Sequence, residues 1–416
     1  MAHLAFVCPA LAGHLNPMLA LGAALHERGH RVTFFCEVDA ATAIEKAGLE
    51  FCAVGEKSHP AGTLAATSRK MARVNGLVGI FPIIEDMAGT TNMLCTELPA
   101  AFTRYKIDAV VCDQLEAAGG LVATHLRLPY ASVANALLID RDESVPPYFS
   151  HWQPDNSSWA RKRNKGAEDV SDLMMFRHAR VVERHARVFG LGRRRTCADC
   201  LSPNMEISQI VRGFDFPRTN APPQLHYTGP IRQEMADTKP LFELPTGKPL
   251  VFASFGTLFG GRFDLLENVA RACAELGAGL IIAHGGRLTA DQVARLAGKP
   301  IVEAYVPQRA LLAHVDACVT HAGMNTMMDA LAAGVPAVAL PIAFDQPGIA
   351  ARLVASGAGE RVLPKGASVR ALRDALERVL SIPSYRQRAQ QFAEEISAAG
   401  GADRAAGLVE QSIGKA

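Results

Sequence analysis

The chain has 416 residues and a mass of 44.4 kDa, a length that indicates two or three domains. Apolar residues make up 49% of the sequence, which is typical of a globular protein and excludes a disordered or fibrous one. The 43 Lys and Arg residues against 41 Asp and Glu give a net charge of +2, too balanced for a protein that binds nucleic acid along a broad basic face. We therefore expect no nucleic-acid partner.

The cysteines and the apolar segments indicate the cellular compartment of the protein. Nine cysteines, an odd number, do not form the pattern of a secreted disulfide framework. Cys197 and Cys200 form a Cys-x-x-Cys pair that lacks a companion pair, so incidental thiols are favoured over redox or zinc chemistry. The apolar N-terminus lacks the Lys or Arg that opens an export signal, and no apolar run approaches the roughly 20 residues of a membrane span. These features predict a cytoplasmic protein.

Short apolar runs alternate with amphipathic stretches in the first part of the chain, as in a parallel sheet flanked by helices. We expect strands at residues 4–8, 32–36 and 109–112. A helix is expected over residues 17–28, ended by Gly29, and another at the paired glycines that follow the third strand.

Residues 151–200 do not follow this alternation and form a less regular insert. They carry 11 Lys and Arg against 6 Asp and Glu, a local excess of positive charge. A solvated helical face is the simpler interpretation of such an excess. The alternative is a surface attracted to anionic lipid headgroups.

The alternation resumes at Pro249. Strands are expected at residues 250–254, 279–283, 317–320 and 337–340. Helices are expected near residues 264–276, 325–333, 345–356 and 368–380.

The stretch over residues 220–248 is rich in proline and polar residues, the composition of a surface connection. We therefore expect a first domain over residues 1–235, a second over 236–395, and a C-terminal helix within 396–416 that packs back on the first. The predicted fold class is α/β, with two Rossmann-like doubly wound domains facing each other across a cleft. Ligands of such sheets bind at the carboxyl ends of the strands.

The first candidate site lies where the first strand ends. His14 is expected on the turn above the sheet, before a helix that Asn16 caps and Pro17 begins. Asp113 follows an apolar run at a second strand end. A carboxylate facing an imidazole fixes its tautomer and raises its basicity, which suits a general base. A histidine that only packs the turn is the alternative.

The second candidate site is the segment 320–329, where a strand ends, turns through Gly323 and enters a helix. A helix start offers unpaired N–H groups and a positive dipole end, which together hold phosphate. Asn325 and Thr326 add side-chain donors, and Asp329 lies one turn further, within reach of a ribose hydroxyl. The expected ligand is a nucleotide, and the absence of a GxxxxGK motif argues against P-loop hydrolysis of ATP or GTP.

Two neighbouring loops add candidates to this site. Tyr305 precedes Pro307 by two residues and places a flat ring where a base can stack, although packing alone would also explain it. Asp345 and Gln346 follow the next strand end and supply a carboxylate and an amide, which suit sugar hydroxyls.

These motifs together resemble a known family. The blocks are Gly13-His14-x-Asn16-Pro17, Tyr305-x-Pro307-Gln308, His321-x-Gly323-x-Asn325-Thr326-x-x-Asp329 and Asp345-Gln346. In this order they resemble the UDP-glycosyltransferases of the GT-B fold. Further stretches, at residues 92–99, 113–116, 252–258 and 343–348, are similar to the zeaxanthin glucosyltransferases of carotenoid-making bacteria. The resemblance covers nearly the whole chain.

The resemblance implies a UDP-glucose site in the second domain. Tyr305 would lie against the uracil, Gln308 and Asp329 at the ribose, and Asp345 and Gln346 at the glucose. The diphosphate would be held by His321, Asn325 and Thr326, and the site would be completed by Gly256, Thr257, Val306 and Gly323. Many relatives have Trp in place of Tyr305 and Glu in place of Asp329, which leaves uridine and thymidine both open as the nucleoside.

The same resemblance implies a reaction. His14 would deprotonate a hydroxyl of a hydrophobic acceptor, most closely zeaxanthin or a related hydroxycarotenoid, with Asp113 as its partner and the first domain as the acceptor pocket. Direct displacement would invert the sugar and give a β-glucoside, with UDP-glucose as co-substrate and no metal or other cofactor expected. The alternatives are a smaller phenol, flavonoid or macrolide acceptor, a nucleotide-sugar binding protein without catalysis, or a sugar-nucleotide epimerase.

A polyene alcohol also implies access to a membrane. The basic insert at residues 151–200 and the apolar run at 77–84 would then place a cytoplasmic enzyme at the inner membrane face.

Overall fold

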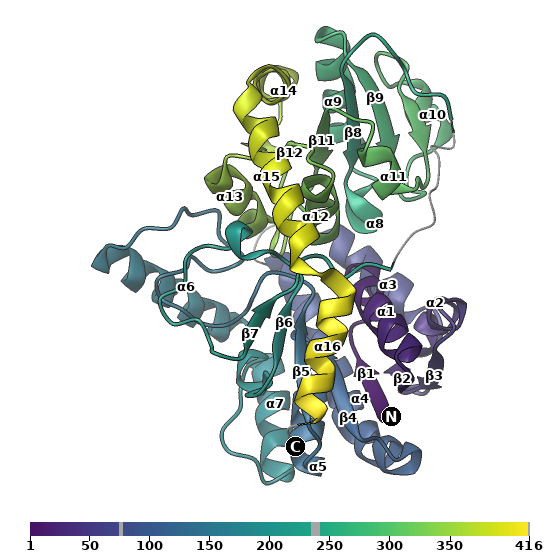
Figure 1. Ribbon diagram of the computed structural model, residues 1–416, viewed down its shortest axis with the longest axis vertical. Coiled ribbons are helices and arrows are strands. Elements are labelled where there is room, and N and C mark those ends of the chain that lie inside the picture. The colour runs from purple at the N-terminus through teal and green to yellow at the C-terminus, as the bar shows by residue number, and fades with distance from the viewer. Residues whose placement is uncertain (75–77, 234–241, 415–416) are drawn as a thin grey trace.

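The computed structural model describes residues 1–74, 78–233 and 242–414, and contains two parallel sheets, each in its own lobe (Figure 1). The expected boundary at residue 235 lies outside the described residues. The chain passes from the first sheet to the second after residue 233 and returns along its C-terminal helices, which run from one lobe onto the other (Figure 1). The arrangement is α/β with both sheets flanked by helices, as the alternation of apolar and amphipathic runs predicts.

The first sheet has seven strands in the order β3-β2-β1-β4-β5-β6-β7. Its strands are β1 His3–Val7, β2 Arg31–Cys36, β3 Glu50–Ala53, β4 Ala109–Asp113, β5 Tyr130–Ala134, β6 Glu206–Ser208 and β7 Leu225–Tyr227. Strand β1 pairs in register with β2 on one side and with β4 on the other. This central position explains why every residue of β1 is buried.

Seven helices accompany the first sheet in the described part of the chain. They are α1 Ala12–Glu27, α2 Ala41–Lys46, α3 Thr63–Ala72, α4 Phe81–Tyr105, α5 Ala117–Leu126, α6 Ser158–Met174 and α7 Phe176–Val188. Short 3₁₀ turns lie at η1 Val38–Ala40, η2 Val78–Ile80, η3 Ala198–Cys200 and η4 Arg212–Phe214. Residues 151–200 are therefore more regular than we expected, because Ser157 caps α6 and α7 follows with one turn residue between them.

The second sheet has six strands in the order β10-β9-β8-β11-β12-β13. Its strands are β8 Leu250–Ser254, β9 Gly279–Ala283, β10 Ile301–Glu303, β11 Ala317–Thr320, β12 Ala337–Ala339 and β13 Gly359–Arg361. Its helices are α8 Gly256–Phe259, α9 Phe263–Glu275, α10 Ala290–Ala294, α11 Gln308–Leu312, α12 Met324–Ala332, α13 Gln346–Ser356 and α14 Val369–Ser381, with a 3₁₀ turn η5 Pro364–Gly366. The strands and helices expected here are confirmed to within a residue or two.

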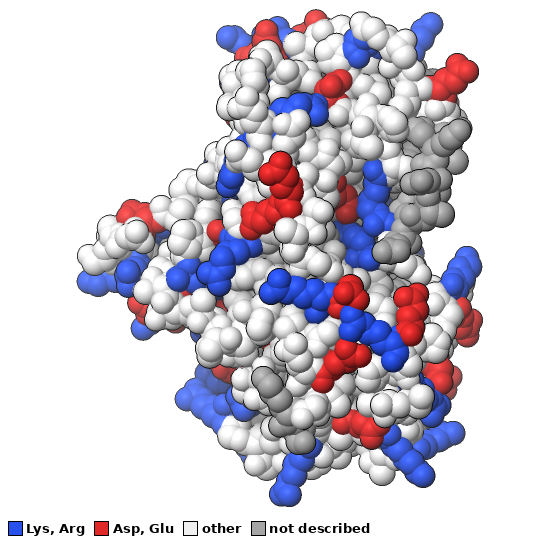
Figure 2. All heavy atoms as spheres, in the orientation of Figure 1, with Lys and Arg blue, Asp and Glu red and all other residues white. Residues whose placement is uncertain are grey.

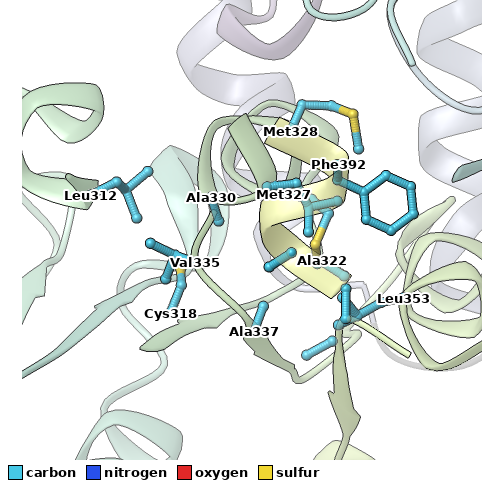
Figure 3. Close-up of a cluster of buried hydrophobic side chains, with 14 of the residues drawn as sticks. Leu312, Cys318, Ala322, Met327, Met328, Ala330, Val335, Ala337, Leu353 and Phe392 are labelled. Atoms are coloured by element: carbon cyan, nitrogen blue, oxygen red, sulfur yellow. The ribbon is translucent and has the colours of Figure 1, made fainter. Parts of the chain in front are cut away.

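The two final helices connect the lobes. Helix α15 Pro383–Ala399 packs on α12, and Figure 3 shows Phe392 of α15 beside Met327 and Met328 of α12. The chain then turns through Gly400, whose φ of 87° an L side chain rarely adopts, into helix α16 Gly401–Ile413. Helix α16 packs on α1 of the first lobe.

One hydrophobic core is shared by both lobes. It joins buried residues of α12 and α13 to Leu137, Ile210 and Phe214, which belong to the first part of the chain. A second contact brings α13 so close that a Cβ added at Gly348 would lie 2.1 Å from the carbonyl oxygen of Tyr148. The relative position of the lobes is therefore set by close packing.

The surface carries charges of both signs in mixture, and Figure 2 shows this on the face that carries α16. The pattern agrees with the net charge of +2. No helix within residues 1–74, 78–233 and 242–414 combines the length and apolar character needed to span a bilayer.

Candidate active site

A cavity of about 2290 Å³ lies between the two sheets and is lined by residues of both. The first half contributes His14 and Asn135, and the second contributes Gly323, Asn325 and Asp345. These residues lie in the turns, or in the first turns of the helices, that follow β1, β5, β11 and β12, at the carboxyl ends of the strands, as expected for open parallel sheets.

His14 lies in the first turn of α1, which begins at Ala12, five residues earlier than we expected. Leu11 takes the position before the helix, so Asn16 does not cap it and Pro17 lies inside it. Because Pro17 has no N–H, it cannot donate to the carbonyl four residues back, which belongs to Gly13. The correction matters, since that carbonyl is left available to another partner.

The His14 ring contacts Asp113, the last residue of the neighbouring strand β4. Its Nδ1 lies 2.7 Å from Oδ2 of Asp113, whose side chain is fully buried. Asp113 also accepts from Nδ2 of Asn135 at 2.7 Å and from the backbone N–H of Leu115 at 2.8 Å. A carboxylate held by three donors assigns the ring proton to Nδ1, and leaves Nε2 as the acceptor.

The environment raises the pKa of His14. Burial alone would lower it, but the charge of Asp113 and its hydrogen bond outweigh burial, and Asp345 adds to them. The pKa of Asp345 is itself raised, chiefly because the carboxyl group is buried. Asp345 therefore faces His14 from the other half of the molecule, and its Oδ2 accepts weakly from the N–H of Leu137 at 3.4 Å.

The turn between β11 and α12 forms the opposite wall. Ala322 has a φ of 64°, a conformation that costs energy for any residue with a Cβ and is concentrated at functional sites. A Cβ at Gly323 would lie 2.5 Å from the His321 ring, so only glycine fits there. The turn thus brings the ring against the first N–H groups of a nine-residue helix.

His321 is neutral near pH 7, because burial lowers its pKa to about 4. Gly256 packs on the same ring from the end of β8, where an added Cβ would lie 3.0 Å from it. A neutral imidazole can donate a single hydrogen bond, so the positive potential at this wall comes from the N–H groups of α12.

Gln308, Thr326 and Asp329 form one hydrogen-bonded set. Nε2 of Gln308 donates to Oδ2 of Asp329 at 2.8 Å, and its Oε1 accepts from the Thr326 hydroxyl at 3.3 Å. The other oxygen of Asp329 accepts from Nε of Arg232 at 3.0 Å. The sequence pattern did not single out Arg232, which precedes the undescribed part of the connection between the sheets.

Asn325 connects the two halves directly. Its Nδ2 donates at 3.1 Å to the carbonyl of Gly13, the group that Pro17 leaves without an intrahelical partner. Its Oδ1 accepts from Nη2 of Arg232 at 3.1 Å and from Nε2 of Gln209 at 3.3 Å. Helix α12 therefore contacts Gly13, the residue next to His14.

Comparison with known proteins identifies the family. The model of the UDP-glucoronosyl and UDP-glucosyl transferase family matches residues 6–394. The chain belongs to this family. Two zeaxanthin glucosyltransferases are among its relatives. The one from Pantoea ananas is 37% identical, over 99% of this chain and 96% of the relative, and the one from Pseudescherichia vulneris is 38% identical, over 99% and 98%.

Solved structures establish the fold of this glycosyltransferase. The glycosyltransferase of kitacinnamycin has a TM-score of 0.79 at 23% identity and covers 99% of both chains. The calicheamicin glycosyltransferase CalG4 has a TM-score of 0.79 at 21% identity, over 100% of this chain and 99% of its own. These structures confirm the expected GT-B fold. The family model and the zeaxanthin glucosyltransferase relatives show that the protein is a glycosyltransferase.

Some expected donor residues of the glycosyltransferase lie away from the cavity or have other partners. Tyr305, Val306 and Asp329 do not line it, and Tyr305 is 67% exposed, with its hydroxyl donating to the carbonyl of Gly285 at 3.3 Å. Thr257 lines the cavity beside Gly256. Oε1 of Gln346 accepts from two N–H groups of its own loop, at 2.8 and 2.9 Å.

Sequence reasoning missed Asn135, Gln209 and Arg232. Asn135 directly follows an apolar strand, the same signal that identified Asp113, and could have been found by it. Gln209 and Arg232 follow short strands at the far edge of the sheet, where the pattern is weak.

The Cys-x-x-Cys pair of the glycosyltransferase lies outside the cavity. Both thiols are free, and burial raises the pKa of Cys197 and Cys200, which makes them inert. Among residues 1–74, 78–233 and 242–414 there is no group of three His, Cys, Asp or Glu side chains arranged to hold a metal ion.

Proposed function

We propose that the protein transfers glucose from UDP-glucose to a hydroxyl of zeaxanthin or a related hydroxycarotenoid and gives a β-glucoside. The observation that carries the proposal is the His14 and Asp113 pair at 2.7 Å, which faces the start of α12 across the cavity. The full-length similarity to zeaxanthin glucosyltransferases supports the choice of acceptor.

His14 acts as the general base in this proposal. An alcohol has a pKa of about 15 and is a poor nucleophile, so Nε2 of His14 takes its proton as the oxygen attacks the anomeric carbon. The bond from that carbon to the phosphate oxygen breaks, and UDP leaves with the electron pair. A single displacement inverts the configuration from α to β. Asp113 stabilises the imidazolium that forms.

The leaving diphosphate would bind at the start of α12. The N–H groups there and the positive end of the helix suit the charge that develops on it. We propose that His321, Asn325 and Thr326 contact it, that Gln308 and Asp329 bind the ribose, and that Asp345 and Gln346 bind the glucose. The uracil would stack on Tyr305, with Gly256, Thr257, Val306 and Gly323 completing the walls.

The acceptor pocket in this proposal is the part of the cavity that lies within the first half. Its lining is largely apolar and comes from α3, α4, α6 and the loop after β5, including Met71, Ile84, Met87, Leu137, Phe149, Trp152, Val170 and Met174. Such a lining suits a long apolar acceptor, because each buried CH₂ contributes about 0.8 kcal/mol.

The test is incubation with UDP-glucose and a panel of acceptors, followed by mass spectrometry. Zeaxanthin should gain a hexose mass, and nuclear magnetic resonance of the product should show a β linkage. Transfer only to a smaller phenol, flavonoid or macrolide would overturn the acceptor. An altered free donor would indicate an epimerase, and UDP binding without any turnover would indicate a binding protein. Replacing UDP-glucose with dTDP-glucose in the same assay decides the nucleoside.

We also propose that the enzyme works in the cytoplasm at the surface of an anionic membrane, through α6. Val170 lines the cavity and is 56% exposed, and on the same helix Trp159 is 64% and Leu173 is 74% exposed. Large apolar side chains exposed together at a cavity mouth suit a bilayer interface.

The charged side chains of residues 151–200 indicate which cations could contact lipid. Most cations of residues 151–200 already have partners: Arg177 pairs with Glu85, Lys165 lies 3.8 Å from Glu143, and Arg163 stacks on Trp152. Within the described residues, four of these cations, Arg161, Lys162, Arg187 and Arg193, make no side-chain ion pair, hydrogen bond or ring contact, and the two that belong to α6 are Arg161 and Lys162. They lie on α6 beside Trp159 and would meet lipid phosphate.

Flotation with vesicles tests this surface. The protein should float with vesicles containing phosphatidylglycerol, and the variant W159S/L173S should not. V188S is the control, since Val188 is 73% exposed but lies on α7 and not on α6. Equal flotation of all three proteins, or indifference to lipid charge, would favour the solvated helical face.

A further inference from the structure

Arg232 contacts both halves of the enzyme at once. It follows strand β7 by five residues, where the chain leaves the first sheet. Toward the second half, its Nε donates to Oδ1 of Asp329 at 3.0 Å, and its Nη2 to Oδ1 of Asn325 at 3.1 Å. Toward the first half, its Nη1 donates to Oε1 of Gln209 at 3.0 Å. The guanidinium thus bridges the interface between the sheets.

The hydrogen bonds continue from Arg232 to the base. Gln209 is fully buried, and its Nε2 donates to the backbone carbonyl of Asn135. The side chain of Asn135 in turn donates to Asp113, which holds His14. One chain of contacts therefore runs from the acid expected at the ribose to the partner of the general base.

A second, shorter series of hydrogen bonds also connects Arg232 to the backbone beside His14. Asn325, which accepts from Arg232, donates at 3.1 Å to the carbonyl of Gly13 beside His14. Both routes cross between the halves, and both pass through Arg232 or a residue that it contacts. Removing the guanidinium would leave the buried Oε1 of Gln209 without this donor.

We propose that Arg232 is a positioning residue that couples binding of the nucleotide to the placement of His14. The proposal rests on the proposed function, in which Asp329 accepts from the ribose. Arg232 is the ion-pair partner of Asp329 among the described residues, and the pair is largely buried. It fixes one carboxylate oxygen while Gln308 fixes the other, so each oxygen keeps a lone pair for a ribose hydroxyl.

The fork of arginine is required for this role. Three acceptors, on Asp329, Asn325 and Gln209, lie around one planar group, and a lysine ammonium cannot reach all three from one position. A lysine would retain the charge opposite Asp329 and lose the bridge to Gln209. Charge and bridge can therefore be separated by substitution.

Three variants test the coupling in the full-length enzyme. Arg232→Ala should weaken UDP binding, measured by calorimetry, and raise the KM for UDP-glucose by roughly 10- to 100-fold, because a buried carboxylate loses its charged partner. It should also lower kcat about tenfold. Arg232→Lys should recover most of the UDP affinity but little of the kcat. Gln209→Ala should lower kcat and leave the UDP affinity within about twofold, and it should add nothing to Arg232→Ala.

The controls separate this role from stability and from the reaction itself. Arg271→Ala removes an exposed arginine that pairs with Glu267 on α9, and should change neither parameter. All measurements are made below the unfolding midpoint of each variant. Wild-type KM and kcat in Arg232→Ala, or a change in its unfolding midpoint alone, would overturn the coupling. Calorimetry with UDP needs no acceptor, so the inference is still tested if zeaxanthin proves to be the wrong substrate.

Discussion

The two halves use the same strand, turn and helix unit but build their walls of the cavity differently. In the second half, most site residues lie between Tyr305 and Gln346, at successive strand ends and in the helices that follow them, and Gly256 and Thr257 follow β8. In the first half, His14 and Asp113 are 99 residues apart, Gln209 follows β6, and Arg232 lies in the connection after β7. One wall is local in sequence, and the other is assembled by the topology of the sheet.

The backbone differs in the same way. The second half places residues with a Cβ in the left-handed region at two strand ends, Ala322 with a φ of 64° and Phe344 with a φ of 58°. The turn after β1 has no such residue and instead frees a carbonyl through Pro17. The other described residues with a Cβ and a positive φ, Lys106, Arg127 and Lys299, do not line the cavity, so Ala322 and Phe344 are the strained positions beside the expected leaving group, where rigid N–H groups are of use.

The largest effect is expected at the wall that topology assembles. His14→Asn should lower turnover by about 10² to 10⁴, because the alcohol loses its base. UDP binding should be unchanged, since the proposed nucleotide site lies in the other half. Calorimetry and initial rates measure the two quantities separately. Near-normal turnover would remove His14 from the mechanism.

The next effect concerns the contact between the halves. Asp215 accepts from Arg218 at 2.8 Å within the first half, and from Arg352 of α13 at 2.8 Å, and all three side chains are buried. Asp215→Ala would leave two buried guanidinium groups without their carboxylate, at a cost of about 3–5 kcal/mol in the free energy of unfolding. Denaturant unfolding measures this loss, and a change below 1 kcal/mol would show that the pair does not stabilise the interface.

The same group predicts a dependence on pH. Burial alone would raise the pKa of Asp215, but the two guanidinium groups lower it from 3.8 to about 2. A depressed pKa in the folded state gives stability that is present above pH 4 and is lost as the pH falls toward 2. The stability of Asp215→Ala should therefore vary less with pH over this interval than that of the wild type.

Whether the sequence predicts an element of this fold depends on the same difference between local signals and tertiary contacts. Strands β8, β9 and β11 were predicted to the residue, because buried parallel strands are short apolar runs between turn signals. The start of α1 was predicted five residues late, because Asn16 and Pro17 are typical of helix starts and only the fold shows that Leu11 takes this position. Local rules fail where tertiary contacts decide the boundary.

The contacts of the candidate site are likewise of two kinds, those within a short motif and those between residues that the fold brings together. The close approach of His321 to Gly323 follows from a short motif, whereas the contact of Asn325 with Gly13 joins residues 312 apart. Arg232 stands in a segment that reads as a polar connection, and its role depends on groups brought to it by both sheets. The pairing of His14 with Asp113 was a hypothesis from two strand ends, and the central neighbours β1 and β4 place them together.

A smaller effect is expected when the partner of the base is changed. Asp113→Asn removes the negative charge that raises the pKa of His14, and burial then lowers that pKa. Because the base must be unprotonated, the rate is lost as the pH falls through this pKa. The acid limb of the kcat/KM profile should therefore move to lower pH, with a rate about 10²-fold lower at its plateau. An unmoved limb would assign it to another group.

The smallest effect compares glycines from the two halves. A Cβ at Gly323 would lie 2.5 Å from the His321 ring, and Gly256 packs against the same ring, where an added Cβ would lie 3.0 Å from it. Gly323→Ala should therefore lower the free energy of unfolding by about 1–3 kcal/mol, as overpacking does. The displaced ring should also weaken UDP binding. Gly89 is an exposed residue of α4, and an added Cβ there meets nothing within 4 Å, so Gly89→Ala should instead stabilise the protein by about 0.5–1 kcal/mol. Equal changes in stability for the two variants would show that the close packing of Gly323 against His321 has no special cost. The contrast between the halves would then not extend to their turns.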